Sequence, residues 1–507
     1  MRIIFTSLLF FCSFILNAQN LSGIERDDAI ENEHYGWNVE TSNSFIVVGS
    51  PNTKNSDLED AGAIHIYQKL NERWQRFQDI KSPNPSVFEN FGYTIAIYGD
   101  YLAVSAIGSF KYGPFTGAVY LYKNSGVTWD LDKIFYPETQ VPNQWYGYSL
   151  AMNEDYLVVG AINANGVNAE SGEVFVYKDY TKESNVEVST LATATQSKND
   201  KFGYDVAISS NNKILVGAPY VDGHYENCGT AYLYTLNEEN KWNVDQTFKP
   251  QSGGISDLFG TSVDLHDSNL VIGAMLGDGN EKNSGIVYGY NYNNTSKAYE
   301  FTQKIEAAEG ELNDYFGISL KLYQDVLLVG APRSKTENNS HAGKAYVFKK
   351  EGGTWLESKV LKEPTSKEDN HFGSDVALAQ GHIVISSRLN DDLATDAGEV
   401  YVSEFDETLP IDLESITGSS VKSFPIPSDT QVSVTYKLFK STQVSLTIVD
   451  VNGKEVKTIL RDTAQQPGDY NITWDLTTNT GVRASSGLYV YKLMFNGNTF
   501  SGKLLVH

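Results

Sequence analysis

The sequence predicts an all-β protein, in which a seven-bladed β-propeller with four-stranded blades precedes a C-terminal Ig-like β-sandwich. Three observations support this fold. An aromatic-glycine pair recurs seven times at intervals of 55 to 57 residues. Each copy repeats the same succession of short strand-like segments, and no stretch has the 3.6-residue apolar period of an amphipathic helix. The composition, with 31 Tyr and 42 Gly among 507 residues, suits many short strands and tight turns.

The aromatic-glycine pairs open seven copies of one unit. They are Tyr35-Gly36, Phe91-Gly92, Tyr146-Gly147, Phe202-Gly203, Phe259-Gly260, Phe316-Gly317 and Phe372-Gly373. So steady a period is the signature of a repeat architecture, and four strands per unit indicate a propeller blade. We expect the glycine to allow close backbone approach where the blades converge, and the aromatic ring to fill the wedge between neighbouring sheets.

The strands follow in the same order in each copy. The first carries the aromatic-glycine pair, and a short polar turn leads to an almost entirely apolar second strand, such as residues 156–161, which predicts burial on both faces. A polar loop, a glycine and a third strand follow, and the alternation in residues 116–123 predicts a half-covered face for that strand. The fourth strand often carries Trp or Phe, as in residues 73–80.

The seventh copy has no such fourth strand after its third strand, which begins near Gly398. Residues 21–28 stand just before the first aromatic-glycine pair, where a fourth strand stands before each later pair. We therefore expect this N-terminal segment to complete the last blade and to close the ring without an open seam.

The first residues have the pattern of a secretory signal. One Arg precedes an apolar run from Ile3 to Leu16, with a cleavage site expected near Ala18. Removal of residues 1–18 would leave Cys228 as the only cysteine, so no intrachain disulfide is expected. The net charge of −24 argues against nucleic acid and anionic membranes as partners, because phosphate contacts need clustered Lys and Arg.

The repeat resembles the FG-GAP repeat of the integrin α-subunit propeller, over residues 20–404. The fourth copy carries the motif in full, as Phe202-Gly203, Val216-Gly217-Ala218-Pro219 and Gly229-Thr230-Ala231-Tyr232. Many members of that family hold Ca²⁺ in an Asp-x-Asp-x-Asp-Gly loop between the first two strands. The corresponding connections here, such as residues 323–325 and 266–268, are too short to supply the oxygens that Ca²⁺ requires. We therefore expect no metal site of this type and no cofactor.

The last residues change to a period-two pattern, which predicts a separate β-sandwich. This region resembles the type A C-terminal sorting domain of the Bacteroidetes type IX secretion system. The matching segments are Phe424-Pro425-Ile426-Pro427-Ser428, residues 450–456, Gly468-Asp469-Tyr470 with Trp474, Ser486-Gly487-Leu488-Tyr489 and Gly502-Lys503-Leu504-Leu505. The resemblance implies export through the periplasm to the cell surface, with the secretion machinery and its sortase as partners. It also implies removal of this domain, followed by release or attachment to surface lipopolysaccharide.

These features predict four parts of the chain. They are a signal peptide at 1–18, the propeller at 19–408, a linker at 409–420 and the sorting domain at 421–507. Processing is expected between residues 409 and 423. The alternative for the last part is an accessory sandwich that binds a ligand.

No catalytic signature is evident, since the sequence has no Gly-x-Ser-x-Gly, no His-Glu-x-x-His and only scattered His residues. The connections from second to third strands, and those between blades, should emerge on one face of the propeller, which we call the loop face. Loops on a rigid scaffold commonly carry function. Aromatic side chains beside charged ones there are suited to hold a sugar or a protein. The candidate ligand-binding residues are Lys111, Tyr112, Phe115, Tyr220, Asp222, His224, Tyr225 and Arg333.

Two functions from different classes fit these features. The first is a secreted or cell-surface binding or adhesion protein without catalytic activity, which holds a protein or a glycan on its loop face. The second is a secreted enzyme that degrades polysaccharide or peptide, with acids or His from several blades at the channel mouth. A scaffold without a small ligand is a third possibility.

Overall fold

The computed structural model describes residues 21–506, apart from 27, 71–72, 139–140, 185, 194–195, 251–253, 337–338, 405–421, 425–429, 439–441, 451–453, 467 and 496–497. The predicted signal peptide, the linker and its processing region up to residue 421 lie outside these residues. The chain divides into two compact units, residues 1–405 and 406–507. The described residues form strands and no helix, and therefore contain no helix that could cross a membrane.

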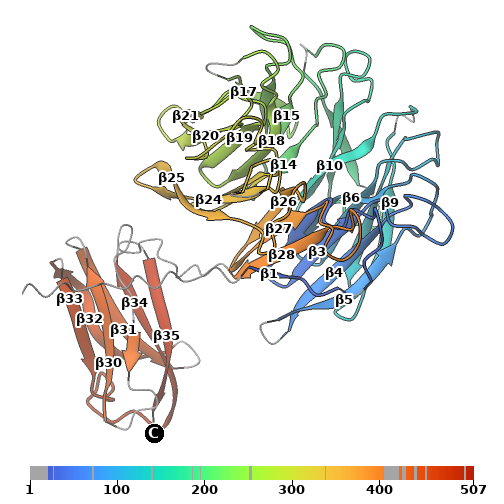
Figure 1. The fold of residues 1–507 in the computed structure, drawn as a ribbon. Coiled ribbons are helices and arrows are strands. Elements are labelled where there is room, and N and C mark those ends of the chain that lie inside the picture. Colours follow the sequence, from blue (N-terminus) through green and yellow to red (C-terminus); the bar gives the residue numbers. More distant parts are fainter. Residues whose placement is uncertain are drawn as a thin grey trace, which may run out of the picture. The chain divides into compact units, whose positions relative to one another are not determined.

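The first unit contains seven four-stranded antiparallel sheets, the blades, each built from strands consecutive in the chain except the last (Figure 1). Blades 1 to 3 are β2 (Val39–Thr41), β3 (Phe45–Ser50), β4 (Ala63–Leu70) and β5 (Arg73–Lys81); β6 (Phe91–Tyr98), β7 (Tyr101–Ala106), β8 (Ala118–Asn124) and β9 (Trp129–Phe135); and β10 (Tyr146–Met152), β11 (Tyr156–Ala161), β12 (Glu173–Lys178) and β13 (Glu187–Leu191).

Blades 4 to 6 are β14 (Val206–Ile208), β15 (Ile214–Ala218), β16 (Thr230–Leu236) and β17 (Trp242–Phe248); β18 (Phe259–His266), β19 (Asn269–Ala274), β20 (Ile286–Asn293) and β21 (Ala298–Ile305); and β22 (Leu320–Tyr323), β23 (Val326–Ala331), β24 (Lys344–Glu351) and β25 (Thr354–Leu361). Blade 7 is β26 (Phe372–Ala379), β27 (His382–Ser387), β28 (Glu399–Glu404) and β1 (Leu21–Gly23). Inner strands of consecutive blades contact one another, and β26 of blade 7 contacts β2 of blade 1, so the blades form a closed ring.

The N-terminal segment completes the last blade, as predicted. Strand β1 pairs antiparallel with β28, with Leu21 opposite Ser403 and Gly23 opposite Tyr401. Beyond β1, the guanidinium of Arg26 is buried over the ring of Tyr35, with its central carbon 4.2 Å from the ring centre, and forms an ion pair with Glu33. The two ends of the propeller sequence are therefore joined by backbone pairing, and the buried ion pair fixes the segment between β1 and β2.

Neighbouring blades are in backbone contact at two glycine positions of the repeat unit, which Gly92 and Gly172 illustrate. Gly92, from an aromatic-glycine pair, has φ +90°, and a Cβ atom built on it would lie 2.5 Å from the carbonyl oxygen of Ala63 in blade 1. Gly172, which precedes the third strand of blade 3, also has φ +90°, and its Cβ would lie 2.1 Å from the carbonyl oxygen of Phe202 in blade 4. The predicted close approach is therefore confirmed.

The aromatic residues of the pairs fill the wedge between blades, as predicted. Phe91 of blade 2 is fully buried in a cluster that includes Phe45 and Val47 of blade 1, and its ring centre lies 5.3 Å from that of Tyr120. In blades 1, 4 and 6 the pair stands before the inner strand rather than inside it. In all seven copies the glycine and the residue before the aromatic one, such as Lys201 before Phe202, have positive φ, so the chain bends sharply at the pair.

The prediction of a half-covered third strand was wrong. The first five residues of β4 and of β8 are all buried, and the same holds for β16 and β20. A neighbouring blade packs on each face of the sheet, so both sets of alternating side chains are covered. It is the fourth strand, at the rim, that alternates between exposed and partly buried residues, as in β5.

The second unit is a sandwich of two antiparallel sheets. One contains β29 (Lys422–Phe424), β30 (Val432–Leu438) and β33 (Gly468–Trp474), and the other contains β31 (Thr442–Asp450), β32 (Glu455–Gln465), β34 (Gly487–Phe495) and β35 (Asn498–Val506). Its core surrounds Trp474, which is 1% exposed, and includes Val434 and Leu446. The β-sandwich expected from the period-two pattern is thus present.

Replacing Gly172 with Ala should strongly destabilise the propeller. The added Cβ would overlap backbone atoms of Phe202, which cannot move without separating blades 3 and 4, so we expect a loss of about 3 kcal/mol in the free energy of unfolding. The matched control is Gly381→Ala, because Gly381 has φ +85° but nothing within 4 Å of its Cβ. The control should lose only about 1 kcal/mol. Equal losses in chemical denaturation would contradict the proposed contact.

Candidate functional site

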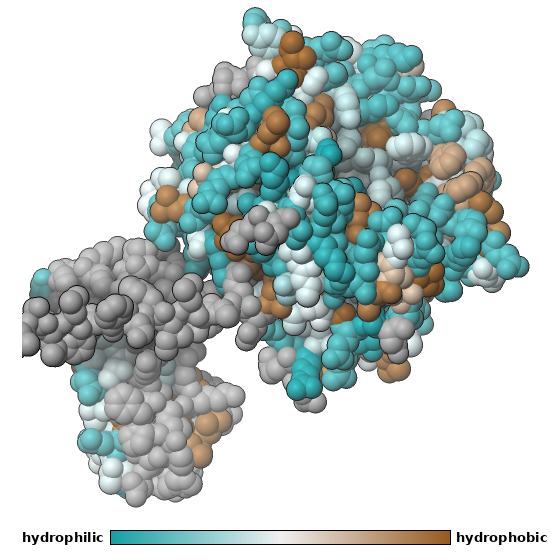
Figure 2. Space-filling view, in the orientation of Figure 1, coloured by the Kyte–Doolittle hydropathy of each residue, from teal (hydrophilic) through white to brown (hydrophobic). Residues whose placement is uncertain are grey.

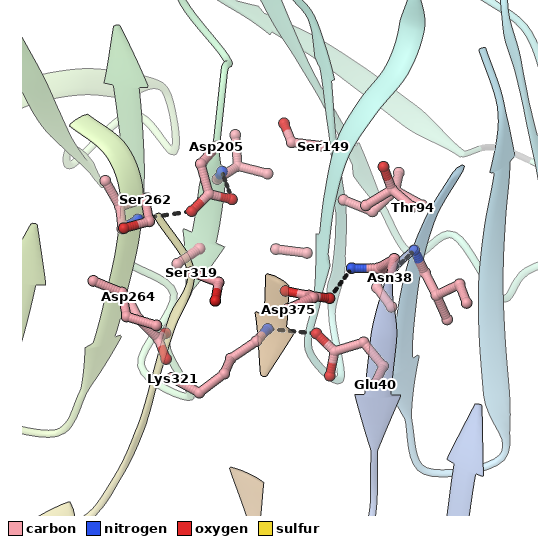
Figure 3. Close-up of a pocket in the computed structure, with 18 of the residues that line it drawn as sticks. Asn38, Glu40, Thr94, Ser149, Asp205, Ser262, Asp264, Ser319, Lys321 and Asp375 are labelled. Carbon is pink, nitrogen blue, oxygen red and sulfur yellow. Dashed lines mark hydrogen bonds and ion pairs between the residues drawn. The ribbon is translucent and has the colours of Figure 1, made fainter. Parts of the chain in front are cut away.

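The ring of blades encloses a central cavity of about 410 Å³ that is lined by the inner strands of all seven blades (Figure 3). Its size lies within the range of about 300–1,000 Å³ that is usual for small-molecule sites. Because every blade contributes the same sequence positions, the lining side chains form successive layers. Each layer is defined by its distance in sequence from the aromatic-glycine pair.

The residue directly after each pair forms the first layer. In blades 1 to 4 it is aromatic, and we call Trp37, Tyr93, Tyr148 and Tyr204 the aromatic arc. The ring centres of successive members lie 5.4, 5.5 and 5.2 Å apart, with the rings tilted by 43 to 54°. In blades 5 to 7 the same position holds Thr261, Ile318 and Ser374. The cavity therefore has an aromatic wall on one side only.

The aromatic arc lies at the loop-face end of the channel. Each aromatic-glycine pair is joined by a backbone bridge or close contact to the end of a loop between second and third strands, as Phe91 is joined to Gly62. Tyr204 also contacts Tyr220 of such a loop, with ring centres 6.1 Å apart. Burial raises the pKa of Tyr93 to about 12 and that of Tyr148 well above 10, so both phenols are neutral at physiological pH.

The next residue in each blade forms a second layer, the polar ring, which contains Asn38, Thr94, Ser149, Asp205, Ser262, Ser319 and Asp375. Its acidic and amide members accept hydrogen bonds from the inner strand of the following blade. Asp205 Oδ2 accepts from the backbone N–H of Val263 at 2.7 Å. Asp375 Oδ2 accepts from the N–H of Val39 at 2.8 Å, across the seam where the ring closes.

The hydroxyl members of the polar ring make the converse bond, by donating to carbonyl groups of the following blade. Ser149 Oγ donates to Gly203 at 2.7 Å, and Ser262 Oγ donates to Gly317 at 2.6 Å. Thr94 Oγ1 donates to the carbonyl oxygen of Tyr148 at 2.7 Å. The polar ring thus connects each blade to the next around the channel.

The third layer is formed by the residues that stand two positions after the polar ring. In three blades this residue is charged. Lys321 of blade 6 forms an ion pair with Glu40 of blade 1 (Figure 3). Asp264 Oδ2 of blade 5 accepts from the N–H of Leu322 at 2.7 Å. Burial alone would lower the pKa of Lys321, but the charges of Glu40 and Asp264 outweigh burial and raise it, so the ammonium stays charged. Ala96, Ala151, Ala207 and Ala377 occupy this position in the other blades.

Two carboxyl groups of the polar ring have strongly shifted acidity. Burial raises the pKa of Asp205 and that of Asp375 to about 7, against an ordinary value near 3.8. The backbone N–H groups that they accept from, and the charge of Lys321, act in the opposite direction but do not restore the ordinary value. Both groups therefore exchange protons near neutral pH.

One cation of the site is a departure from the repeat. Arg388 follows the second strand of blade 7, where the other blades have Pro51, Ile107, Ile162, Pro219, Met275 and Pro332. Its guanidinium carbon lies 4.9 Å from the ring centre of Trp37, and its side chain lines the cavity.

The eight candidate residues predicted from the sequence do not come together. In the blade 2 loop, Lys111 Nζ lies 4.1 Å from the ring centre of Tyr136, Tyr112 packs edge-on against the same ring, and Phe115 packs against Phe110. These four aromatic rings contact one another in pairs. Lys111 and Tyr112 are exposed, so this loop presents a cation and an aromatic surface to solvent.

The remaining candidates lie in two other loops. In blade 4, Tyr220 contacts the aromatic arc, Asp222 Oδ1 accepts from the N–H of Asn227 at 2.9 Å, and the exposed His224 and Tyr225 pack on each other. In blade 6, Arg333 Nη1 donates to the hydroxyl of Tyr315 at 2.9 Å. Only Tyr220 adjoins the channel, and whether any of the eight binds a ligand stays a prediction. Among the described residues, no three His, Cys, Asp or Glu side chains are grouped so as to hold a metal ion.

The sequence matches the family model of the FG-GAP repeat six times, at residues 74–122, 129–177, 186–234, 242–290, 299–348 and 355–403. The matches together cover more than half of the chain. This chain belongs to the FG-GAP repeat family. Each match begins near the fourth strand of one blade and ends in the third strand of the next, and the ring-closing unit from β1 to β4 has no match. Residues 418–496 match the model of the FlgD Ig-like domain.

Solved structures that resemble the fold include two bacterial proteins. One is PorZ, described as an essential bacterial surface component of the type-IX secretion system of Porphyromonas gingivalis, with 11% identity, a TM-score of 0.46 and coverage of 95% of this chain and 61% of PorZ. The other is the Pseudomonas aeruginosa periplasmic gluconolactonase PpgL, with 13% identity, a TM-score of 0.42 and coverage of 64% and 84%. This chain thus spans about three fifths of the length of PorZ. None of the curated proteins matches the sequence.

Asp205 should make the protein less stable as pH rises. Its pKa is about 7 in the folded protein and near 3.8 without the fold, so the folded state binds one more proton between these values. The free energy of unfolding therefore falls between about pH 4 and pH 7. Asp205→Asn removes this contribution and keeps an acceptor for an N–H, as Asn38 does toward Ile95 in blade 1.

The measurement is the melting temperature between about pH 4 and pH 8. The decline with pH should be smaller in Asp205→Asn than in the wild type, and the control Asp130→Asn, at an exposed site of β9, should follow the wild type. Parallel curves for the wild type and Asp205→Asn would show that this carboxyl does not titrate as described.

Proposed function

We propose that this protein is a secreted or cell-surface binding or adhesion protein without catalytic activity, and that it presents the loop face of its propeller to a protein or glycan. The observation that supports this most is that the aromatic and the acidic side chains of the channel have different surroundings. The aromatic arc lies at the loop-face end, whereas the carboxylates Asp205, Asp264 and Asp375 are engaged in hydrogen bonds between blades.

The surface of the propeller agrees with a polar ligand or partner. On the face shown in Figure 2, hydrophilic residues predominate and hydrophobic residues stand singly or in small groups. Large contiguous apolar patches mark many protein-docking surfaces, whereas sugars are held by a few aromatic rings among polar groups. The exposed aromatic side chains of the loop face, Phe110, Tyr112 and Tyr225, have this distribution.

A hydrolytic enzyme is the second candidate, and one observation favours it. Asp205 and Asp375 come from different blades, line the cavity and have pKa values of about 7, which is the range of a general acid. Against this stands the engagement of Asp375 Oδ2 with both the N–H of Val39 and the amide of Asn38. Loss of polymer turnover in Asp375→Asn would support the enzyme.

The export route is the other part of the proposal. The resemblance of residues 421–507 to a type A sorting domain suggests passage through the periplasm and the type IX secretion machinery. A sortase would then cleave between residues 409 and 423. Release from the cell or attachment to surface lipopolysaccharide would follow.

The binding function is tested by probing glycan and protein arrays with the full chain. We expect a signal with at least one class of ligand, and we expect Tyr112→Ala or Tyr225→Ala to weaken it, because both side chains are exposed on the loop face. Turnover of a polysaccharide or peptide without any retained ligand would overturn the proposal in favour of the enzyme.

The export route is tested by deleting residues 421–507 in the native host. If these residues carry the sorting signal, the truncated protein should accumulate in the periplasm, and the intact protein should reach the cell surface or the medium. Cell fractionation followed by immunoblotting measures this distribution. Surface display of the truncated protein would refute the assignment.

A further inference from the structure

Arg388 is a feature of the channel that the hydrogen bonds between blades do not use. Its guanidinium lines the cavity beside Trp37, and no hydrogen bond or ion pair joins it to any residue in the described part of the chain. A partly buried cation without a hydrogen-bonded anion is costly: burial lowers the pKa of this group, and the charge of Asp375 offsets only part of that effect. Since six blades hold an apolar residue here, the fold itself does not require an arginine at this position.

The polar ring can accept hydrogen bonds from a ligand but can donate few. Thr94, Ser149 and Ser262 each have one hydroxyl hydrogen, and each donates it to a carbonyl of the next blade. Their remaining lone pairs, with the oxygens of Asp205 and Asp375 in the ionised form, are acceptors. A ligand that enters the cavity must therefore bring several donors of its own, as the hydroxyl groups of a sugar do.

The aromatic arc adds an apolar surface beside these acceptors. Its four rings are tilted against one another, so they form a curved wall on one side of the cavity. Sugar rings combine an apolar C–H face, which packs on such rings, with hydroxyl groups at the edge. A cationic group placed beside the aromatic arc would be repelled by Arg388.

We propose that the loop-face end of the channel binds an acidic saccharide, whose carboxylate pairs with Arg388 and whose sugar ring packs on the aromatic arc. Arg388 has the planar pair of donors that suits a carboxylate. The hydroxyl groups of the sugar donate to the polar ring. The inference rests on the proposed binding function and adds to it the position of the site and the class of ligand.

The test uses the full chain and a glycan array with uronic acid- and sialic acid-terminated glycans, their methyl esters and neutral glycans. We expect binding to carboxylate-bearing glycans and at least about tenfold weaker binding to the methyl esters, which keep the ring but lose the charge. The main variant is Arg388→Met, because Met275 occupies the equivalent position in blade 5. It should weaken binding by at least about tenfold.

Two further variants make the result specific. Trp37→Thr has a precedent in Thr261 of blade 5 and should also weaken binding. Lys241→Met, which removes an exposed cation in the turn before β17, should leave affinity unchanged. Thermal unfolding of each variant establishes that it is folded.

The outcomes separate this inference from the proposed function. Selective binding of neutral glycans, or acidic-glycan binding that survives both Arg388→Met and Trp37→Thr in folded protein, would overturn the assigned site and ligand class. Binding of proteins but of no glycan would overturn it likewise, and would leave the general binding function standing. If the protein bound to neither array, both the assigned site and the general binding function would be refuted.

Discussion

The structure depends on how closely the backbones of neighbouring blades approach one another. At the start of each third strand a glycine faces the backbone of the aromatic residue that opens the next blade, from Gly62 and Phe91 to Gly398 and Tyr35. A side chain at these positions would overlap peptide atoms, so the blades converge only because the sequence supplies glycine in every copy. Gly398 and Tyr35 make this contact at the closing seam, where β1 also pairs with β28.

This approach determines what the channel is made of. Because the inner strands are this close, a short side chain on one strand reaches the backbone of the next strand. The hydrogen bonds of the polar ring form in this way. Asp375 bonds to blade 1 as Asp205 bonds to blade 5, so the closing seam resembles the other joints. This close approach removes the carboxyl groups of Asp205 and Asp375 from water, and the loss of hydration raises their pKa values. A raised pKa in this channel has a structural cause and does not by itself identify a catalytic acid.

The blades and their order could be predicted from periodicity alone, because the repeat is regular and each copy carries its own turns. Closure could be predicted because one fourth strand was missing and one unassigned segment preceded the first pair. The third strands were misjudged because their alternate residues are Tyr. Tyr120 and Tyr122 are buried, and Tyr120 donates to Glu89, so the polar end of the ring is satisfied inside the protein.

The channel site could be predicted less well. The partners of the polar ring are backbone groups of the next blade, which the sequence does not show. The aromatic arc and Arg388 were visible only as departures from the repeat, at Trp37 against Thr261 and at Arg388 against Pro332. Shared positions in a repeat protein build the scaffold, so positions that break the pattern are the better guide to a ligand site.

The central claim is that inner strands of adjacent blades are joined by hydrogen bonds around the channel. Hydrogen exchange, resolved to single amides, tests it most directly at Val39, Ile95 and Val263, whose N–H groups donate to side chains of the preceding blade. These amides should exchange only with unfolding of the whole propeller, and so rank among its slowest. Exchange as fast as that of exposed hairpin turns, such as Gly353, would show that the blades are not joined in this way.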